Sequence, residues 1–211
     1  MIIAITGRIG SGKSTVSKEF SSRLQAPIVD ADKIAKEITS FGGDAVDAIS
    51  IKFGDSFIKD GAMDREKMRN LVFSNPSAKV MLEATLKPYI KNKITQELNE
   101  ANSKSKYVIL DIPLLVGSEW LKKVDFVITV DVTESIQQER IHKRNGHSYD
   151  TINKMMNAQP SRNQYKEIAN YVFDNSTYES FDSHILKCIN KIQEMKKWKL
   201  LFYYTDSICI V

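Results

Sequence analysis

Residues 7–15, GRIGSGKST, constrain this chain more than any other stretch of its sequence. They match the full phosphate-binding-loop (P-loop) pattern, in which a glycine and four further residues precede Gly-Lys-Ser or Gly-Lys-Thr. Glycines let the backbone curl until several N–H groups point into one hollow, which larger side chains would block. A helix that begins directly behind them adds its positive N-terminal end. The stretch therefore predicts a cradle for phosphate groups rather than an ordinary strand-to-helix turn.

The flanking sequence meets the structural requirement of this motif. Residues 1–6, MIIAIT, form a β-rich run, and Val16, Phe20 and Leu24 recur at the spacing of one helix face. In the P-loop pattern the lysine reaches the β- and γ-phosphates and the following hydroxyl binds Mg²⁺, so ATP and Mg²⁺ are the expected cofactors. The predicted ATP-binding residues of this motif are Gly10, Ser11, Gly12, Lys13, Ser14 and Thr15.

Four further β-rich runs follow, at residues 26–29, 106–112, 124–130 and 171–173, with helical patterns between them. This alternation predicts an α/β fold of the P-loop NTPase type, with a mostly parallel five-stranded sheet flanked by helices. Residues 32–100 are too many for a simple crossover and predict a helical insertion, and residues 99–106 are expected to form a polar return loop. Residues 140–165 include an irregular stretch that we interpret as a lid. Residues 1–211 then form a single domain, with its core at residues 1–31 and 106–198.

The composition excludes several other classes of protein. Of 211 residues, 42% are hydrophobic and 27% charged, as in globular domains, and the net charge of +4 suits a polyanionic small molecule better than nucleic acid. The two cysteines, Cys188 and Cys209, fit free thiols in a reducing compartment, and the three histidines lack metal-ligand spacing. Neither a signal peptide nor a membrane span is evident. We therefore expect a cytoplasmic protein without membrane or nucleic-acid partners.

Carboxylates follow two of the predicted strands. Asp111 ends the run YVILD, where it could hold Mg²⁺ directly or through water, or could simply begin a turn before Pro113. Asp30 and Asp32 in VDADK end the second strand. One of them could accept the proton of an acceptor hydroxyl, or they could cap the next helix. The spacing does not choose between these two carboxylates.

Basic residues near the predicted lid form a second group. Arg140 and Arg144 are i, i+4 neighbours, and with Arg162 they could close over phosphates and balance the charge that develops during transfer. A solvated basic helix face is the ordinary alternative. The last strand runs into Asn175, which could border the adenine base.

Two other nucleotide-binding classes fit poorly. The glycines run G-x-x-G-x-G rather than the G-x-G-x-x-G of a nicotinamide-binding Rossmann enzyme, and Tyr89-x-x-x-Lys93 lies in the helical insertion, far from any strand end. The guanine-reading tetrad N-K-x-D of a GTPase does not occur.

Over about residues 1–198 the chain resembles the dephospho-CoA kinase family. The resemblance depends on TGRIGSGKST, VDADKIAKEI, DGAMDREKMRNLVFSNP, VILDIPLL, ERIHKRNG and AQPSRNQYKEIANYVFDNS, in this order. It implies an ATP-dependent kinase that phosphorylates the ribose 3′-hydroxyl of dephospho-CoA, with the insertion as acceptor-binding region. It also implies Asp32 as catalytic base, with Lys13, Arg140 and Arg144 stabilising the transferring phosphoryl group.

The chain departs from this family's usual pattern at several positions. Arg8 stands where glycine is common, Lys87 replaces a usual histidine, and Gly117 occupies the place of a glutamate, with Glu119 the nearest acid. The apolar tail 199–211 has no counterpart and is expected to pack on the core or a neighbouring subunit. A kinase for another nucleoside or nucleotide, or a non-catalytic ATP-binding protein, stays open, as does the choice between monomer and small homo-oligomer.

Overall fold

Five parallel strands form the centre of the protein, in the order β2-β5-β1-β6-β7. The computed structural model describes the backbone of residues 1–177 and 179–206, and side chains as far as residue 196 except residue 178. The strands are β1 (Ile2–Thr6), β2 (Ile28–Asp30), β5 (Val108–Asp111), β6 (Phe126–Asp131) and β7 (Tyr171–Asp174). The prediction of a mostly parallel five-stranded sheet flanked by helices is confirmed.

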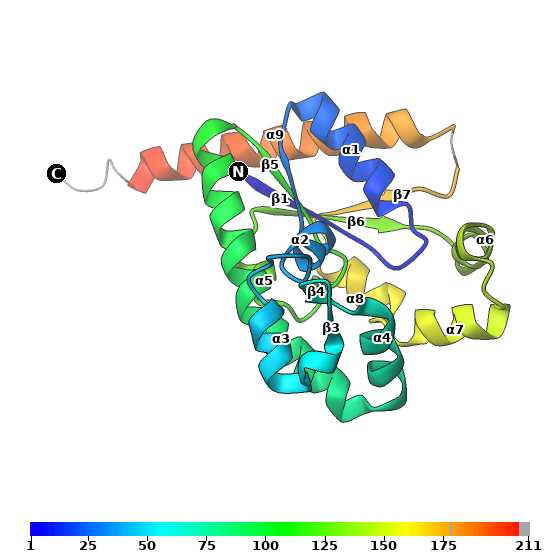
Figure 1. The fold of residues 1–211 in the computed structure, drawn as a ribbon. Coiled ribbons are helices and arrows are strands. Elements are labelled where there is room, and N and C mark those ends of the chain that lie inside the picture. Colours follow the sequence, from blue (N-terminus) through cyan, green and yellow to red (C-terminus); the bar gives the residue numbers. More distant parts are fainter. Residues whose placement is uncertain (178, 207–211) are drawn as a thin grey trace.

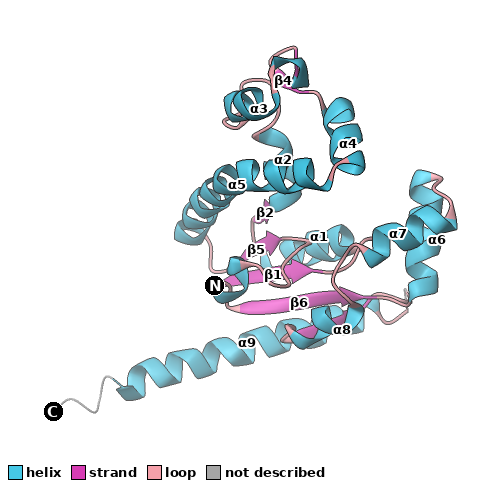
Figure 2. Ribbon diagram, turned by 90° about the horizontal axis from the view of Figure 1, so that it is seen from below, coloured by secondary structure: helices cyan, strands magenta, loops and turns pink. Residues whose placement is uncertain are grey.

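Alternate residues of the strands face two separate hydrophobic clusters, because successive side chains of a strand point to opposite faces. On one face Ala4 and Leu110 pack with Ile94 and Leu98 of α5 (Pro76–Lys104). On the other, Ile3, Ile5 and Ile109 pack with Phe20 of α1 (Lys13–Leu24) and Ile185 and Ile192 of α9 (Phe181–Asp206). Figures 1 and 2 show the sheet between α5 on one side and α9 on the other.

The segment between β2 and β5 is helical as predicted, with two differences. Its elements are α2 (Ala31–Glu37), α3 (Val46–Phe53), η1 (Asp55–Phe57), β3 (Ile58–Lys59), β4 (Ala62–Met63), α4 (Arg65–Ser74) and α5. First, β3 and β4 form a small hairpin around Asp60 and Gly61, which both have positive φ, as a two-residue hairpin turn requires. Second, the polar return loop expected at residues 99–106 is wrong, because α5 continues to Lys104 and buries Leu98 against the sheet.

Short helices follow β5 and β6. The segment after β5 contains η2 (Glu119–Lys122), and α6 (Glu134–Asn145), α7 (Tyr149–Asn157) and α8 (Arg162–Glu167) lie between β6 and β7. Ser148 and Ser161 cap α7 and α8, so most of the stretch that looked irregular in sequence is helical. In Figure 1, α6 and α7 extend beyond the end of the sheet at which the P-loop lies.

The last helix, α9, continues into the apolar tail. Its backbone is described to Asp206, and the predicted packing of residues 199–211 falls outside the described side chains. Within the described part of the chain, no helix is both long and apolar enough to cross a membrane.

Candidate active site

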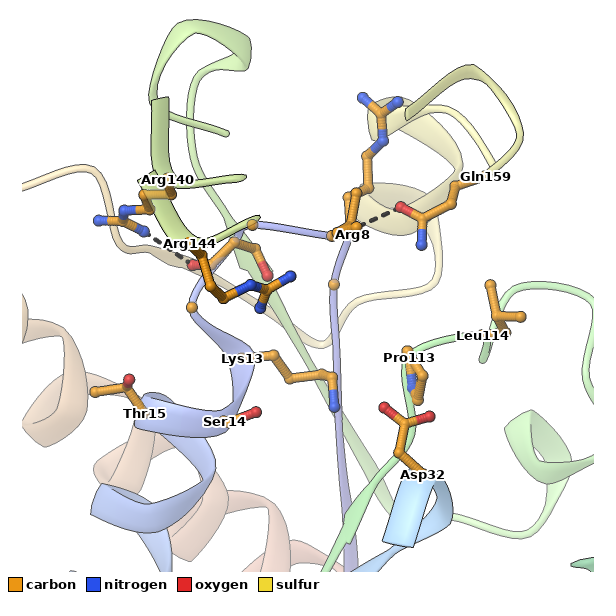
Figure 3. A pocket seen from close by; sticks show the side chains of 15 residues that line it. Arg8, Lys13, Ser14, Thr15, Asp32, Pro113, Leu114, Arg140, Arg144 and Gln159 are labelled. Carbon is orange, nitrogen blue, oxygen red and sulfur yellow. Dashed lines mark hydrogen bonds between the residues drawn. The ribbon is translucent and has the colours of Figure 1, made fainter. Parts of the chain in front are cut away.

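A cleft of about 530 Å³ opens at the carboxyl ends of the central strands (Figure 3). Its largest contribution comes from residues 7–15, which connect β1 to α1. The other lining residues come from α2, from the segment after β5, from α6 and from the segment after α7, and they are Asp32, Pro113, Leu114, Arg140, Arg144 and Gln159. The fold therefore assembles one concave site from segments far apart in the sequence.

The P-loop has a backbone that fits a phosphate. Gly12 has a φ of 85°, and a Cβ on it would lie 2.3 Å from the Asn175 amide nitrogen, so only glycine fits there. The N-terminus of α1 has no side-chain cap; the Thr15 N–H donates to the Gly12 carbonyl oxygen at 3.0 Å, and the N–H groups of Lys13 and Ser14 are left to a ligand or water. The Ser11 hydroxyl is buried and has no hydrogen-bond partner within the protein. Uncapped amides at a helix N-terminus are the donors that an anion needs.

Lys13 is neutralised within the protein by Asp111. Its ammonium group forms an ion pair and hydrogen bond with the Asp111 carboxylate, whose side chain is only 4% exposed. Burial lowers the pKa of Lys13 from its ordinary value, although the charges of Asp32 and Asp30 oppose that shift. Lys13 is thus held at the floor of the cleft, where an incoming phosphate would compete with Asp111 for it.

The two carboxylates that end β2 have different environments. Asp30 is the N-cap of α2, and its carboxylate accepts hydrogen bonds from the backbone N–H groups of Asp32 and Lys33, at 2.9 and 3.0 Å. Asp32 is exposed, lines the cleft, and faces Lys13 in Figure 3. The structure therefore gives Asp30 the capping position and brings Asp32 to the site.

Two of the predicted arginines reach the cleft. Arg140 donates to the Ser11 carbonyl oxygen at 3.2 Å and to the Asn175 carbonyl oxygen at 2.9 Å. Asn175 in turn donates to the Ser11 carbonyl oxygen at 2.8 Å, so both residues brace the P-loop. Arg144 is exposed and extends over the loop toward Lys13 (Figure 3).

Arg162 is placed elsewhere. Its guanidinium makes two hydrogen bonds, of 2.6 and 2.8 Å, with the Asp131 carboxylate, which also pairs with Lys166 at 3.0 Å. Arg162 is not among the cleft-lining residues, so its contact with ATP stays a prediction, as does a contact of Asn175 with the adenine. Burial acts to raise the pKa of Asp131, but the hydrogen bonds and charges of Arg162 and Lys166 prevail and lower it.

Several residues of the site were not predicted from the sequence. Pro113, Leu114 and Gln159 line the cleft but belong to no P-loop pattern, and Arg8 is one of the four residues that the pattern leaves unspecified. Among the departures from the family pattern, Lys87 and Gly117 are exposed and do not line the cleft. Glu119 pairs with Lys91 at 2.8 Å and Lys123 at 3.4 Å, away from the cleft lining.

A P-loop at the end of the central strand of a parallel sheet, with a free carboxylate facing its lysine, defines a P-loop kinase. A family model described as dephospho-CoA kinase matches residues 1–180. The dephospho-CoA kinase of Dechloromonas aromatica is 44% identical over 176 residues, which cover 82% of this chain and 84% of that protein. The chain belongs to the dephospho-CoA kinase family.

Solved structures agree with this fold. The crystal structure of TT1252 from Thermus thermophilus has a TM-score of 0.77 and 27% identity, covering 90% of this chain and 95% of that one. Dephospho-CoA kinase from Campylobacter jejuni has a TM-score of 0.67 at 22% identity, covering 92% and 97%, and supports the fold alone.

Proposed function

We propose that the protein transfers the γ-phosphate of ATP to the ribose 3′-hydroxyl of dephospho-CoA, giving coenzyme A and ADP. Membership of the family supports this reaction, which is the last step of coenzyme A biosynthesis. The observation that carries the chemistry is the position of Asp32, an exposed carboxylate facing Lys13 across the cleft (Figure 3). Asp32 accepts the proton of the ribose hydroxyl while the hydroxyl oxygen bonds to the γ-phosphorus. The bond between the γ-phosphorus and the bridging oxygen breaks, and ADP leaves with that oxygen.

Positioning and electrostatics supply the rest of the catalysis. The backbone amides of residues 10–15 hold the phosphates. The Lys13 ammonium group leaves the Asp111 carboxylate and binds the phosphate oxygens. Arg144 is exposed beside the loop and can reach the transferring group, whereas Arg140 supports the loop through the Ser11 carbonyl. Residues 32–100 bind the acceptor and residues 140–165 close over the nucleotide, which limits hydrolysis.

The oxygen groups around the P-loop fit Mg²⁺. The Ser14 hydroxyl is exposed at the cleft, and the Asp111 carboxylate becomes available once Lys13 turns to phosphate. Among the described residues no cluster of three or more His, Cys, Asp or Glu could hold a metal. When bound, Mg²⁺ neutralises charge on the β- and γ-phosphates.

Substitution of the proposed base tests this function. We expect Asp32→Asn to lower the turnover number at least about 100-fold, because general-base catalysis contributes that much or more. The Kd for ATP, measured by calorimetry, should change little, since Asp32 does not belong to the P-loop. Glu37→Gln on the same helix, exposed and outside the cleft, is the matched control and should behave as wild type. Equal effects of the two substitutions would reject Asp32 as base.

A panel of acceptors separates the alternatives. Incubation with Mg-ATP and dephospho-CoA, a nucleoside, a nucleoside monophosphate or no acceptor is followed by ADP release. We expect release above background with dephospho-CoA. Release with a nucleoside or its monophosphate alone would indicate a different kinase, and ATP binding without release would indicate a non-catalytic protein. A cytoplasmic location, the absence of nucleic-acid partners and a monomeric or small homo-oligomeric state stay predictions.

A further inference from the structure

Arg8, the second residue of the P-loop, has a buried side chain that does not face the phosphate cradle. The residue is 9% exposed, and an arginine is rarely this buried unless its charge is paired. In Figure 3 its guanidinium points away from Lys13 and Asp32, toward the segment that contains Gln159. A direct role on the transferred phosphate therefore does not explain why a charge is buried at this position.

The guanidinium instead joins the P-loop to α7. Its Nη2 donates a hydrogen bond of 2.7 Å to the carbonyl oxygen of Met156, in the last turn of α7. This carbonyl also accepts from the backbone N–H of Gln159 at 3.2 Å, and because carbonyls at a helix C-terminus carry partial negative charge, a cation is favourable there. Glu134, at the start of α6, lies 3.5 Å from Nη1 but is 67% exposed, and Nε has no partner. The Met156 carbonyl is thus the main buried partner of this charge.

The neighbouring residue, Ile9, is held by the same part of the molecule. Its N–H donates to the Gln159 side-chain oxygen at 2.9 Å, and its carbonyl accepts from the Gln137 amide at 2.8 Å. The Ile9 side chain packs against a small cluster formed by Ile141, Ile152 and Met156. Residues 8 and 9 of the P-loop are therefore held, through backbone and side-chain contacts, by α6, by α7 and by Gln159 in the cleft wall.

We propose that Arg8 is a positioning residue that fastens α7 to the P-loop and so holds Gln159 in the wall of the nucleotide cleft. The charge-assisted hydrogen bond to Met156 is the strongest single bond in this connection. Without it, α7 separates from the loop more often, the cleft admits water, and ATP is hydrolysed in preference to transfer. The kinetic part of this proposal rests on the proposed function, whereas the attachment of α7 does not.

Arg8→Met tests the attachment without leaving a cavity, because methionine can fill much of the same buried space and removes the charge. Replacing a buried charge by an apolar group is often neutral or stabilising for the whole fold. We expect amide hydrogen exchange in α7 to accelerate about tenfold or more in the nucleotide-free protein, the factor expected for a hydrogen bond to a charged group. Exchange in α4 (Arg65–Ser74), which lies in the insertion, should remain unchanged.

Two further variants and one kinetic readout complete the test. Arg8→Lys can still donate to the Met156 carbonyl and should restore slow exchange in part, whereas Glu134→Gln should leave it unchanged because the Glu134 carboxylate is 67% exposed. In Arg8→Met, ADP release without acceptor should rise several-fold relative to transfer. Unchanged exchange in α7, or equal acceleration in α4 and α7, would overturn the proposal. A wild-type protein without dephospho-CoA kinase activity would contradict the proposed function while leaving the exchange result valid.

Discussion

At the scale of single residues, the ion pair of Lys13 and Asp111 is expected to contribute to both stability and chemistry. Asp111 is 3% exposed, so Lys13→Ala leaves a buried carboxylate without its counter-charge. We expect a loss of about 3 kcal/mol in the free energy of unfolding, as when one member of a buried pair is removed. Turnover should also fall at least about 100-fold, since we propose that Lys13 stabilises charge on the transferred group. Urea denaturation and ADP release measure the two effects.

The double variant Lys13→Ala/Asp111→Asn separates these two roles. Removing both charges should restore most of the lost stability, because no uncompensated carboxylate remains, but it cannot restore turnover. Lys18→Ala, an exposed lysine on the same helix, is the matched control and should change neither quantity. A double variant as unstable as the single one, or a single variant with near-normal turnover, would contradict the role given to this pair.

At the scale of secondary-structure elements, α8 is attached to β6 through Asp131, and this attachment depends on pH. The pKa of Asp131 is lowered in the folded protein, since the hydrogen bonds of Arg162 and Lys166 outweigh burial. Above the ordinary pKa of an aspartate, near 4, the folded state gains the full stabilisation. As the pH falls below that value, Asp131 is protonated in the unfolded chain before it is protonated in the folded protein. The stabilisation therefore decreases until the pH reaches the lowered pKa of the folded state.

Asp131→Asn should therefore reduce the acid sensitivity of the fold. We expect it to cost about 2 kcal/mol near pH 7, where charged hydrogen bonds are lost, and to lose less stability than wild type between pH 6 and pH 3. Thermal or urea midpoints across this range measure the difference. Asp44→Asn, at an exposed turn position, is the control and should follow the wild-type profile. Parallel profiles for wild type and Asp131→Asn would show that this pair does not hold α8.

How far the elements could be predicted depended on their length and periodicity. The central strands β1, β5 and β6 were found because they are buried on both faces and their runs are almost entirely apolar. The β3–β4 hairpin was missed because two-residue strands show no periodicity, although Asp60-Gly61 is a hairpin signal. The end of α5 was missed because its last turns are mostly polar, and after Leu98 the small Ala101 is the residue that packs against the cluster on the buried face.

At the scale of the whole molecule, the site could be predicted only in part. The P-loop pattern specified residues 10–15, and the ends of parallel strands brought Asp32 and Asp111 to the same edge of the sheet. Gln159 and Leu114 enter the cleft through tertiary packing of α7 and of the segment after β5, for which no local pattern exists. The same packing decides that Arg162 pairs with Asp131. Long-range partners of this kind require the fold before they can be assigned.

The P-loop follows β1, whose side chains lie in both main hydrophobic clusters, so binding of a triphosphate should stabilise the molecule as a whole. A ligand at 100 times its Kd contributes about 2.7 kcal/mol, which for a chain of this size corresponds to a rise in Tm of roughly 5–10 °C. We expect Mg-ATP to produce this shift and EDTA to reduce it, since Ser14 and Asp111 are the residues that we propose would hold Mg²⁺ beside the phosphates. Adenosine, which lacks phosphates, is the matched ligand control and should give almost no shift. An adenosine shift equal to that of Mg-ATP would mean that the nucleoside, and not the phosphates held by the amides of residues 10–15, provides the binding energy. That result would contradict the phosphate-binding role proposed for the P-loop.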